Sequence, residues 1–393
     1  MISKRKLWWL VAAAAVVLVL YQYLRPLPTI TAIGQTPAAP KTTAVNLPWP
    51  GGGQGALGAA GYGLLESQNT TSPQSIASIA KVITALAVLQ KRPLAVGQLG
   101  PAVTLDSTDA DYFNYYYTRD GSVVNVSVGE QITEYQLLQA MLIPSANNIA
   151  DSLARWAFGS TQAEVAYANQ VVKSMGLAHT TVGNTNGFDD TTTSTADDLV
   201  KLGLTALQNP VIADIVGQKT AMVPVEGQIK NVNFLLGDDG VIGIKTGNTD
   251  KAGGCYLFAA KHLIAGQSIT LVGAVLGSDN LADAITAGRD LLDAADNGFQ
   301  KITAIQKGQI LGSYKAPWGA TSQLKASQEL SLTAWKGKDI EISGDFEPAT
   351  APAKAGAAFG SVRVASSGQS VSSPLYLSQD LSGPSLWWRL TRF

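Results

Sequence analysis

A serine and a lysine three residues apart, Ser78 and Lys81, lie in the stretch SIASIAKVITAL, residues 75 to 86. Apolar residues recur in this stretch at helical intervals, which predicts a buried α-helix with both residues on one face. A serine hydroxyl needs a base to act as a nucleophile, and a lysine amine one turn away can serve once burial or a nearby cation lowers its pKa. Ser75 is nearly two turns from Lys81 and is better placed to cap or precede the helix. Ser78 is therefore the candidate nucleophile.

Two more short motifs follow along the chain. Ser145-Ala146-Asn147 comes after an apolar helical segment, and Lys245-Thr246-Gly247 ends a run typical of a β-strand. Taken singly, Lys245 could be an ordinary strand-end lysine and Asn147 an Asx-turn residue. The order Ser-x-x-Lys, Ser-x-Asn, Lys-Thr-Gly is rare by chance when the motifs fall at a helix start, a loop and a strand. Together they indicate acyl transfer through a serine.

At these residues the chain resembles a known family, the penicillin-binding serine D-alanyl-D-alanine carboxypeptidases of low molecular mass (peptidase S11 type). The resemblance runs from about residue 49 to 299 and includes NTNGFDDTTTSTADDLVKLG, residues 184 to 203, and GDDGVIGIKTGNTDKAGGC around the third motif. It implies an α+β fold. A β-lactamase/transpeptidase-like catalytic domain, an antiparallel sheet flanked by helices, would be followed by a small all-β domain.

The resemblance also implies the roles of the reacting residues. Ser78 attacks the carbonyl between two D-alanines at the end of a peptidoglycan stem peptide, while neutral Lys81 takes its proton. Ser145 relays a proton to the departing amine. Asn147 orients Lys81 and hydrogen-bonds the substrate amide. Water then hydrolyses the acyl-enzyme and releases the shortened peptide.

The third motif is implied to bind the substrate. Lys245 lowers the pKa of Lys81 and attracts the terminal carboxylate, which Thr246 also contacts. Gly247 leaves room for the substrate against the strand, and the backbone N–H groups of Ser78 and Asn248 form the oxyanion hole. The sequence departs from the family at Asn248, where an aromatic residue or histidine is more common, and in lacking a proline just before Ser78.

The amino-acid composition limits which cofactors and partners can be expected. With 28 basic and 29 acidic residues there is no charge surplus that would suggest nucleic acid, and with one cysteine and two histidines there is no cluster of metal-ligand spacing. We expect metal-free chemistry without a cofactor. The family resemblance implies stem peptides ending in D-Ala-D-Ala as substrates and β-lactams as inhibitors.

Other functions share these motifs. A class A β-lactamase adds a glutamate in a Glu-x-x-Leu-Asn stretch between the second and third motifs. The nearest candidate here, Glu164, is followed by VAYAN and does not match. A D,D-endopeptidase or a weak transpeptidase would carry the same three motifs. An anchored wall-binding protein with little turnover is an alternative outside the enzymes, which the intact Ser78, Lys81 and Lys245 disfavour.

The N-terminus predicts a membrane anchor. A cytoplasmic tail, residues 1–6, carries Lys4, Arg5 and Lys6 and precedes the uncharged stretch LWWLVAAAAVVLVLYQYL, residues 7–24. The apolar stretch is longer than that of a cleaved signal peptide and runs into Arg25, which favours an uncut anchor. We therefore expect a single-pass protein of the bacterial cytoplasmic membrane with its catalytic domain on the extracytoplasmic face.

The rest of the chain divides by composition. Residues 25–46 are rich in Pro, Ala and Thr, which predicts an extended linker. Residues 47–299 alternate helical and strand patterns and form the predicted catalytic domain. Residues 300–380 contain short strand patterns and form the predicted small β-domain, and residues 381–393 are an aromatic and basic tail. Helices are predicted over 133–142, 149–158, 164–175 and 196–208, and strands over 240–245, 255–261 and 268–276. The cluster DYFNYYYTRD, residues 111 to 120, is interpreted as a surface loop with partly buried tyrosines.

Overall fold

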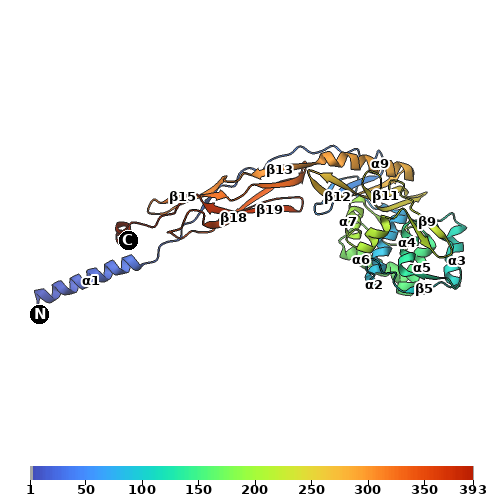
Figure 1. Ribbon diagram of the computed structural model, residues 1–393, viewed down its shortest axis with the longest axis horizontal. Helices are drawn as coiled ribbons and strands as arrows, with labels where there is room; N and C mark the ends of the chain where they lie inside the picture. Colours follow the sequence, from blue (N-terminus) through green and yellow to red (C-terminus); the bar gives the residue numbers. More distant parts are fainter. Residues whose placement is uncertain (1–2, 393) are drawn as a thin grey trace. The chain divides into compact units, whose positions relative to one another are not determined.

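The computed structural model describes residues 3–392, so Met1, Ile2 and Phe393 of the predicted terminal segments lie outside the described residues. The chain divides into two compact units. One unit spans residues 45–299, and the other combines residues 1–44 with 300–393. Figure 1 shows the elements of each, and the two units are described separately below.

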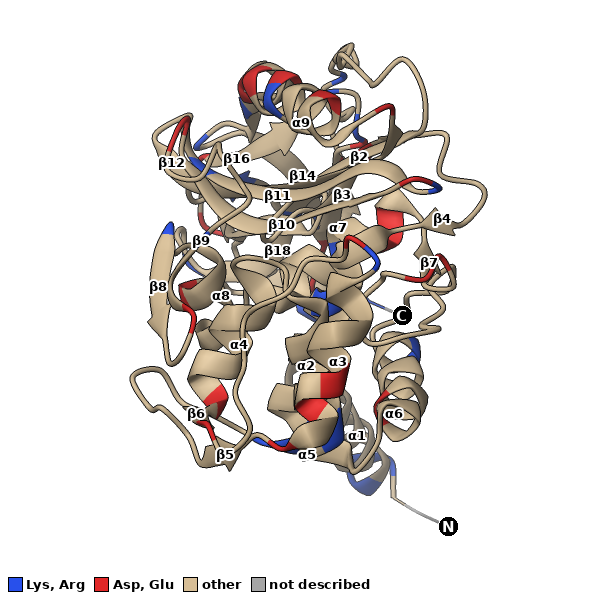
Figure 2. Ribbon diagram, turned by 90° about the vertical axis from the view of Figure 1, so that its right-hand side faces the viewer, with Lys and Arg blue, Asp and Glu red and all other residues tan. Residues whose placement is uncertain are grey.

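The 45–299 unit is built on a five-stranded antiparallel sheet of order β10-β11-β12-β2-β3. Its strands are β2 (Gln54–Ala59), β3 (Gly63–Gln68), β10 (Val241–Thr249), β11 (Gly253–Ile264) and β12 (Gln267–Ser278). Helix α9 (Leu281–Ala295) packs on one face, and α7 (Ala196–Ala206) packs on the other, against β12 and β2 (Figure 2). This mixed architecture agrees with the predicted α+β class.

The remaining helices of this unit gather on the α7 side of the sheet (Figure 2). They are α2 (Ala80–Lys91), α3 (Ser107–Tyr117), α4 (Glu134–Leu142), α5 (Asn147–Phe158), α6 (Thr161–Ser174) and α8 (Pro210–Val216). Short two-stranded pairs connect them: β4 (Gln74–Ser75) with β7 (Thr193–Ser194), β5 (Ala102–Thr104) with β6 (Gln131–Thr133), and β8 (Thr220–Val223) with β9 (Gly227–Lys230). Helix α2 is buried along almost its whole length and contacts α4, α5, α6 and α7, so it forms the centre of the helical layer.

Local sequence signals explain where several helices begin. Thr133 and Gln136 form the predicted capping box at the start of α4. The loop predicted over residues 111–120 is wrong, because α3 covers most of it and is itself started by a capping box of Asp106 and Asp109. The tyrosines of α3 do not predict a helix, because aromatic residues have a low intrinsic helix propensity. Tertiary packing overrides that propensity here.

The segment before α2 also differs from the prediction of one continuous helix. A 3-10 turn, η1 (Ala77–Ile79), carries Ser78, and the α-helix proper begins at Ala80. Ser75 does not cap the helix, because it lies in β4 and its hydroxyl donates to Asp190 at 3.2 Å.

The second unit contains a six-stranded sheet of order β1-β14-β15-β19-β18-β17 and the pair β13-β16. The strands are β1 (Ile33–Gly34), β13 (Phe299–Ile305), β14 (Ile310–Lys315), β15 (Thr321–Ala326), β16 (Leu330–Trp335), β17 (Glu341–Asp345), β18 (Ala358–Ser366) and β19 (Gln369–Leu377). A separate apolar core fills it, with Leu324, Leu375 and Leu377 fully buried.

The segment predicted as an extended linker also contacts this sheet. Ile30 bridges to Ala349, and β1 pairs with β14. The Thr42 hydroxyl accepts a hydrogen bond from the Gly337 amide at 2.7 Å. Its composition did not reveal this, because a proline-rich segment in extended conformation can add to a sheet edge as readily as it can span solvent.

Helix α1 (Lys4–Leu24) is long and apolar enough to cross a membrane, with a mean hydropathy of 2.0. The C-terminal helix α10 (Leu386–Thr391) lies against its end. Arg389 donates to the Tyr23 carbonyl oxygen at 2.9 Å, and Arg392 donates to the Pro26 carbonyl oxygen at 3.1 Å. Two cations thus satisfy carbonyl groups at the C-terminal end of α1, where they also interact favourably with the helix dipole.

Candidate active site

The three motifs meet at one end of β10. The 3-10 turn that carries Ser78 packs on β10, and a β-carbon placed on Gly247 would lie 3.0 Å from the Ser78 nitrogen. Gly247 therefore permits a backbone approach that any larger residue would obstruct. The α5 N-terminus brings Asn147 to the same place, 2.6 Å from the Lys81 amine.

Lys81 is the centre of the site and is completely buried. Its Nζ lies 2.9 Å from Ser78 Oγ, 2.6 Å from Asn147 Oδ1 and 2.8 Å from the Asn186 carbonyl oxygen. A neutral amine has two N–H groups and one lone pair. The two N–H groups suit the amide and carbonyl oxygens, which can only accept, and the lone pair is then directed at the Ser78 hydroxyl.

Electrostatics favour that neutral amine. Burial lowers the pKa of Lys81 well below its usual value, and the charge of Lys245 lowers it further, while the carboxylate of Asp151 opposes both. Lys245 is also buried, its Nζ donates to the Thr246 carbonyl oxygen at 3.0 Å, and burial lowers its pKa to about 7. The arrangement can therefore accept a proton from Ser78 near neutral pH.

Ser145 lies at the positive φ of 69°, a conformation that costs free energy in residues other than glycine. Its hydroxyl oxygen is buried and has no hydrogen-bond partner within residues 3–392. A strained backbone that holds an unpaired hydroxyl beside Asn147 is typical of a functional position.

A cleft of about 460 Å³ opens above the nucleophile. Ser78, Asn147 and Asn248 line it, together with residues from the loops around it: Arg119, Asp120, Gly121, Ser122, Phe188, Asp190, Thr249 and Asp250. Lys245 and Thr246 lie on the same strand, and both are buried. Glu164, the nearest candidate for a β-lactamase glutamate, is not among the residues that line this cleft.

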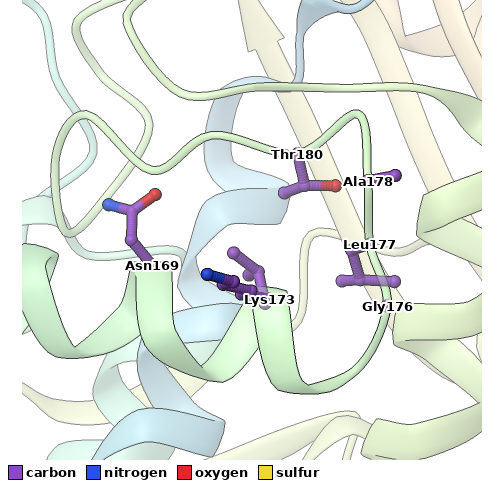
Figure 3. Close-up of a pocket in the computed structure, with 7 residues that line it drawn as sticks. Asn169, Lys173, Gly176, Leu177, Ala178 and Thr180 are labelled. Carbon is purple, nitrogen blue, oxygen red and sulfur yellow. The ribbon is translucent and has the colours of Figure 1, made fainter.

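Another cavity, of about 350 Å³, lies at the C-terminal end of α6 (Figure 3). It is lined by Asn169, Val172, Lys173, Gly176, Leu177, Ala178 and Thr180. Neither the three motifs nor a serine with a neighbouring base contributes to it, so the cleft above Ser78 is the candidate active site.

Four residues near the site have no role that the sequence predicts: Tyr116, Asp151, Thr185 and Asn186. Asn186 binds Lys81 through its backbone carbonyl, which any residue type can supply. Tyr116 lies in the segment predicted as a loop, and Asp151 follows Asn147 by one helical turn with no motif of its own. Only the tertiary fold brings these segments together.

Comparison with known proteins gives a consistent result. The family model of D-alanyl-D-alanine carboxypeptidases matches residues 59–280. The D-alanyl-D-alanine carboxypeptidase of Streptomyces sp. (strain K15) is 29% identical over 246 residues, 56% of this chain and 81% of that protein. DacA, a D-alanyl-D-alanine carboxypeptidase of Escherichia coli (strain K12), is 27% identical over 288 residues, 71% and 70% of the two chains.

A solved structure extends the similarity to the fold. Penicillin-binding protein 5 from Haemophilus influenzae superimposes with a TM-score of 0.62 and 21% identity, covering 86% of this chain and all of that one. At that identity the likeness concerns the fold alone. Since the family model spans more than half of the sequence, the chain belongs to the D-alanyl-D-alanine carboxypeptidase family, peptidase S11.

Proposed function

We propose that this protein is a membrane-anchored serine carboxypeptidase that removes the terminal D-alanine from peptidoglycan stem peptides, with Ser78 as the nucleophile. The contact that carries the proposal is the 2.9 Å approach of the buried Lys81 amine to Ser78 Oγ at the floor of the cleft. A base held at hydrogen-bond distance from a serine that faces solvent is the arrangement that nucleophilic catalysis requires.

The reaction begins when Ser78 Oγ attacks the carbonyl carbon between the two D-alanines and its proton moves to Lys81 Nζ. The carbonyl oxygen becomes an oxyanion, and the N–H groups of Ser78 and Asn248 stabilise it. As the C–N bond breaks, the proton that Lys81 took from Ser78 passes through Ser145 to the D-alanine amine, and Lys81 becomes neutral again. The product of this half-reaction is an ester on Ser78 and free D-alanine.

Water completes the cycle by attacking the ester. Lys81, which is again neutral, takes a proton from the water and passes it to Ser78 Oγ as the ester bond breaks and the shortened peptide leaves. Lys245 and Thr246 hold the terminal carboxylate of the substrate in the first half-reaction only, because that carboxylate departs with the D-alanine. β-Lactams would acylate Ser78 by the same attack on their strained amide.

Helix α1 supports the proposed location. Its length and hydropathy suit a single membrane crossing, and Lys4, Arg5 and Lys6 precede it. Basic residues that flank an apolar helix favour the cytoplasmic side. The catalytic unit would then lie on the extracytoplasmic face, where peptidoglycan is found.

The test is release of D-alanine from a diacetyl-lysyl-D-alanyl-D-alanine peptide by the full chain in detergent. Ser78→Ala should abolish release. Ser75→Ala is the matched control and should retain it, because Ser75 bonds Asp190 rather than Lys81. Release that persists in Ser78→Ala would refute the proposed nucleophile.

A cross-linked dimeric stem peptide distinguishes the endopeptidase alternative. The same groups could open a cross-bridge, so both substrates are compared with the same enzyme preparation. Faster cleavage of the dimer would assign the protein to endopeptidases, and stable labelling by penicillin without release from either peptide would indicate a binding role.

A further inference from the structure

Asp151 is a buried carboxylate of α5 that none of the three motifs contains. Three donors surround it: the Tyr116 hydroxyl at 2.7 Å, the Asn186 side-chain amide at 3.2 Å and the Thr185 hydroxyl. The Tyr116 oxygen also accepts a hydrogen bond from Asn186 at 2.6 Å, so its own proton is directed to Asp151. Every contact therefore brings a proton to the carboxylate, as suits its ionised form.

The same contacts fix the segment that carries Asn186. The Asn186 side-chain oxygen accepts from the Phe188 amide at 2.8 Å, and its amide nitrogen bonds Tyr116 and Asp151. On the opposite side the Thr185 carbonyl accepts from Thr84 at 2.7 Å. These contacts hold the segment on both sides of the Asn186 carbonyl, which lies 2.8 Å from Lys81 Nζ.

We propose that Asp151 is a positioning residue for acylation: through Tyr116, Thr185 and Asn186 it fixes the carbonyl that orients the Lys81 amine. The inference rests on the proposed function, in which Lys81 is the base. It adds a residue that touches neither the substrate nor Ser78.

The negative charge of Asp151 also affects the pKa of Lys81, in a direction that can be tested. Burial raises the pKa of the Asp151 carboxyl, while the hydrogen bonds from Thr185 and Tyr116 and the charge of Lys81 oppose this. The Asp151 charge raises the pKa of Lys81, against burial and Lys245. Removing the charge should lower the pKa of Lys81 and extend acylation to lower pH.

Other ionisable groups near Asp151 could also respond to the loss of its charge. Tyr112 and Tyr116 face it from α3 and Glu164 from α6, and its charge raises the pKa of each. Lys81 faces it from α2. Of these, only Lys81 contacts the nucleophile, so a change in the pH dependence of acylation reports on that amine.

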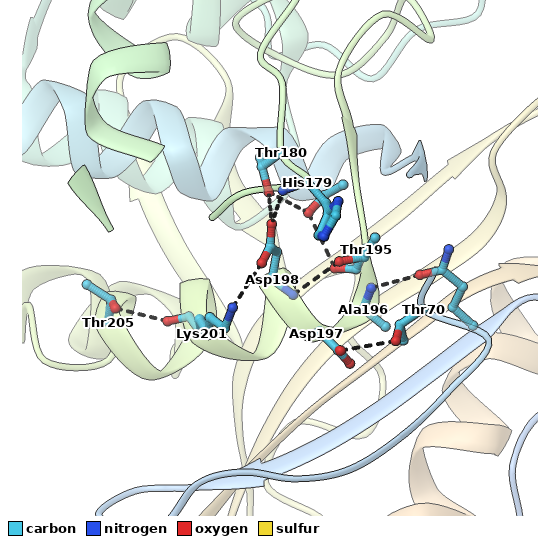
Figure 4. Close-up of polar contacts among 11 residues, drawn as sticks. Thr70, His179, Thr180, Thr195, Ala196, Asp197, Asp198, Lys201 and Thr205 are labelled. Atoms are coloured by element: carbon cyan, nitrogen blue, oxygen red, sulfur yellow. Dashed lines mark hydrogen bonds and ion pairs between the residues drawn. The ribbon is translucent and has the colours of Figure 1, made fainter. Parts of the chain in front are cut away.

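The experiment measures the second-order rate of acylation by a fluorescent penicillin from pH 5 to 10, on the full chain in detergent, for wild type and Asp151→Asn. Asp198→Asn is the matched control. Asp198 is also a buried carboxylate, and it anchors the same loop by accepting from the His179 amide at 2.8 Å and the Thr180 hydroxyl at 3.1 Å (Figure 4). It also pairs with Lys201 at 3.2 Å, but no contact with Lys81 is found in the described part of the chain, so Asp198→Asn reports the loss of a loop anchor and of this ion pair without acting on the Lys81 amine.

We expect the acylation rate of Asp151→Asn at its optimum pH to be about tenfold to a hundredfold lower than that of the wild type, as for misplacement of a catalytic group. The acidic limb of its pH–rate profile, where the rate falls as Lys81 becomes protonated, should also move to lower pH. Asp198→Asn should keep the limb of the wild type. An Asp151→Asn variant with an unchanged rate and limb, or an Asp198→Asn variant with the same displaced limb, would overturn the proposal.

Tyr116→Phe keeps the test decisive if Asp151→Asn fails to fold, as judged by its thermal unfolding. The variant removes the hydroxyl contacts to Asp151 and Asn186 but leaves the charge, so it should slow acylation without moving the limb. A wild-type rate would overturn the proposal. Complete loss of labelling in Ser78→Ala alongside these results would leave the proposed function intact.

Discussion

Replacement of Gly247 by alanine tests how closely β10 must approach the nucleophile. A β-carbon there would lie 3.0 Å from the Ser78 nitrogen, 3.0 Å from the Ala77 β-carbon and 3.1 Å from the Ile76 carbonyl oxygen. Ordinary β-carbon contacts begin at 3.4 Å, so the strand and the turn must separate by about 0.4 Å. None of the three atoms ends a flexible side chain, and only backbone movement can relieve the contact.

The expected loss of acylation rate depends on which atom the added β-carbon displaces. The Ser78 N–H is one of the two proposed oxyanion donors, and removing such a donor costs about 10² to 10³ in rate. A shift of a few tenths of an ångström weakens the donor without removing it, so we expect Gly247→Ala to acylate about tenfold to a hundredfold more slowly. The overpacking should destabilise the fold by about 1–3 kcal/mol.

The assay is the second-order rate of labelling by a fluorescent penicillin, with thermal unfolding measured in parallel. Gly52→Ala is the control, because a β-carbon there would meet nothing within 4 Å. A Gly247→Ala variant that is acylated at the wild-type rate, or a Gly52→Ala variant that is equally slow, would refute the reasoning.

Three further results are expected. Burial lowers the pKa of Lys245 to about 7, so its charge is lost as pH rises through that value. KM for a peptide with a free carboxylate should therefore rise above pH 7. A pH-independent KM would contradict the role of Lys245 in binding the carboxylate. Burial raises the pKa of Glu164 from 4.5 to about 7, so the folded state retains a proton that the unfolded state releases, and about 3 kcal/mol of stability is lost as pH rises between those values. Glu164→Gln should flatten the pH dependence of Tm between pH 5 and 8, and a slope equal to that of the wild type would count against it. Deletion of residues 1–24 should release the protein from membranes on cell fractionation, whereas deletion of 384–393 should not, and the opposite pattern would identify the tail as the tether.

Much of the helical and strand pattern could be predicted, because periodicity and caps are local properties of the sequence. The predicted helix over 133–142 is α4, and the strands predicted over 255–261 and 268–276 are the cores of β11 and β12. The structure also brings the three motifs together, since Ser78 and Asn147 contact Lys81 and Gly247 lies against the Ser78 backbone. Their order and setting could be read from the chain, although their distances could not.

The parts that could not be predicted depend on contacts between distant segments. Asp151 receives hydrogen bonds from residues 34 and 35 positions away, so no spacing rule signals it. The attachment of Ile30 to Ala349 joins opposite ends of the chain, and proline-rich composition gives no sign of a sheet partner. For α3, the capping box of Asp106 and Asp109 is a local signal, but the aromatic residues that follow it have a low intrinsic helix propensity.

The most direct test of the central claim is to locate the acyl group. The full chain is treated with penicillin, digested and analysed by fragmentation mass spectrometry. We predict a single adduct on Ser78, with Ser72 and Ser75 of the same region unmodified, and none after Ser78→Ala. An adduct on another residue, or one that persists in Ser78→Ala, would contradict the account of this site.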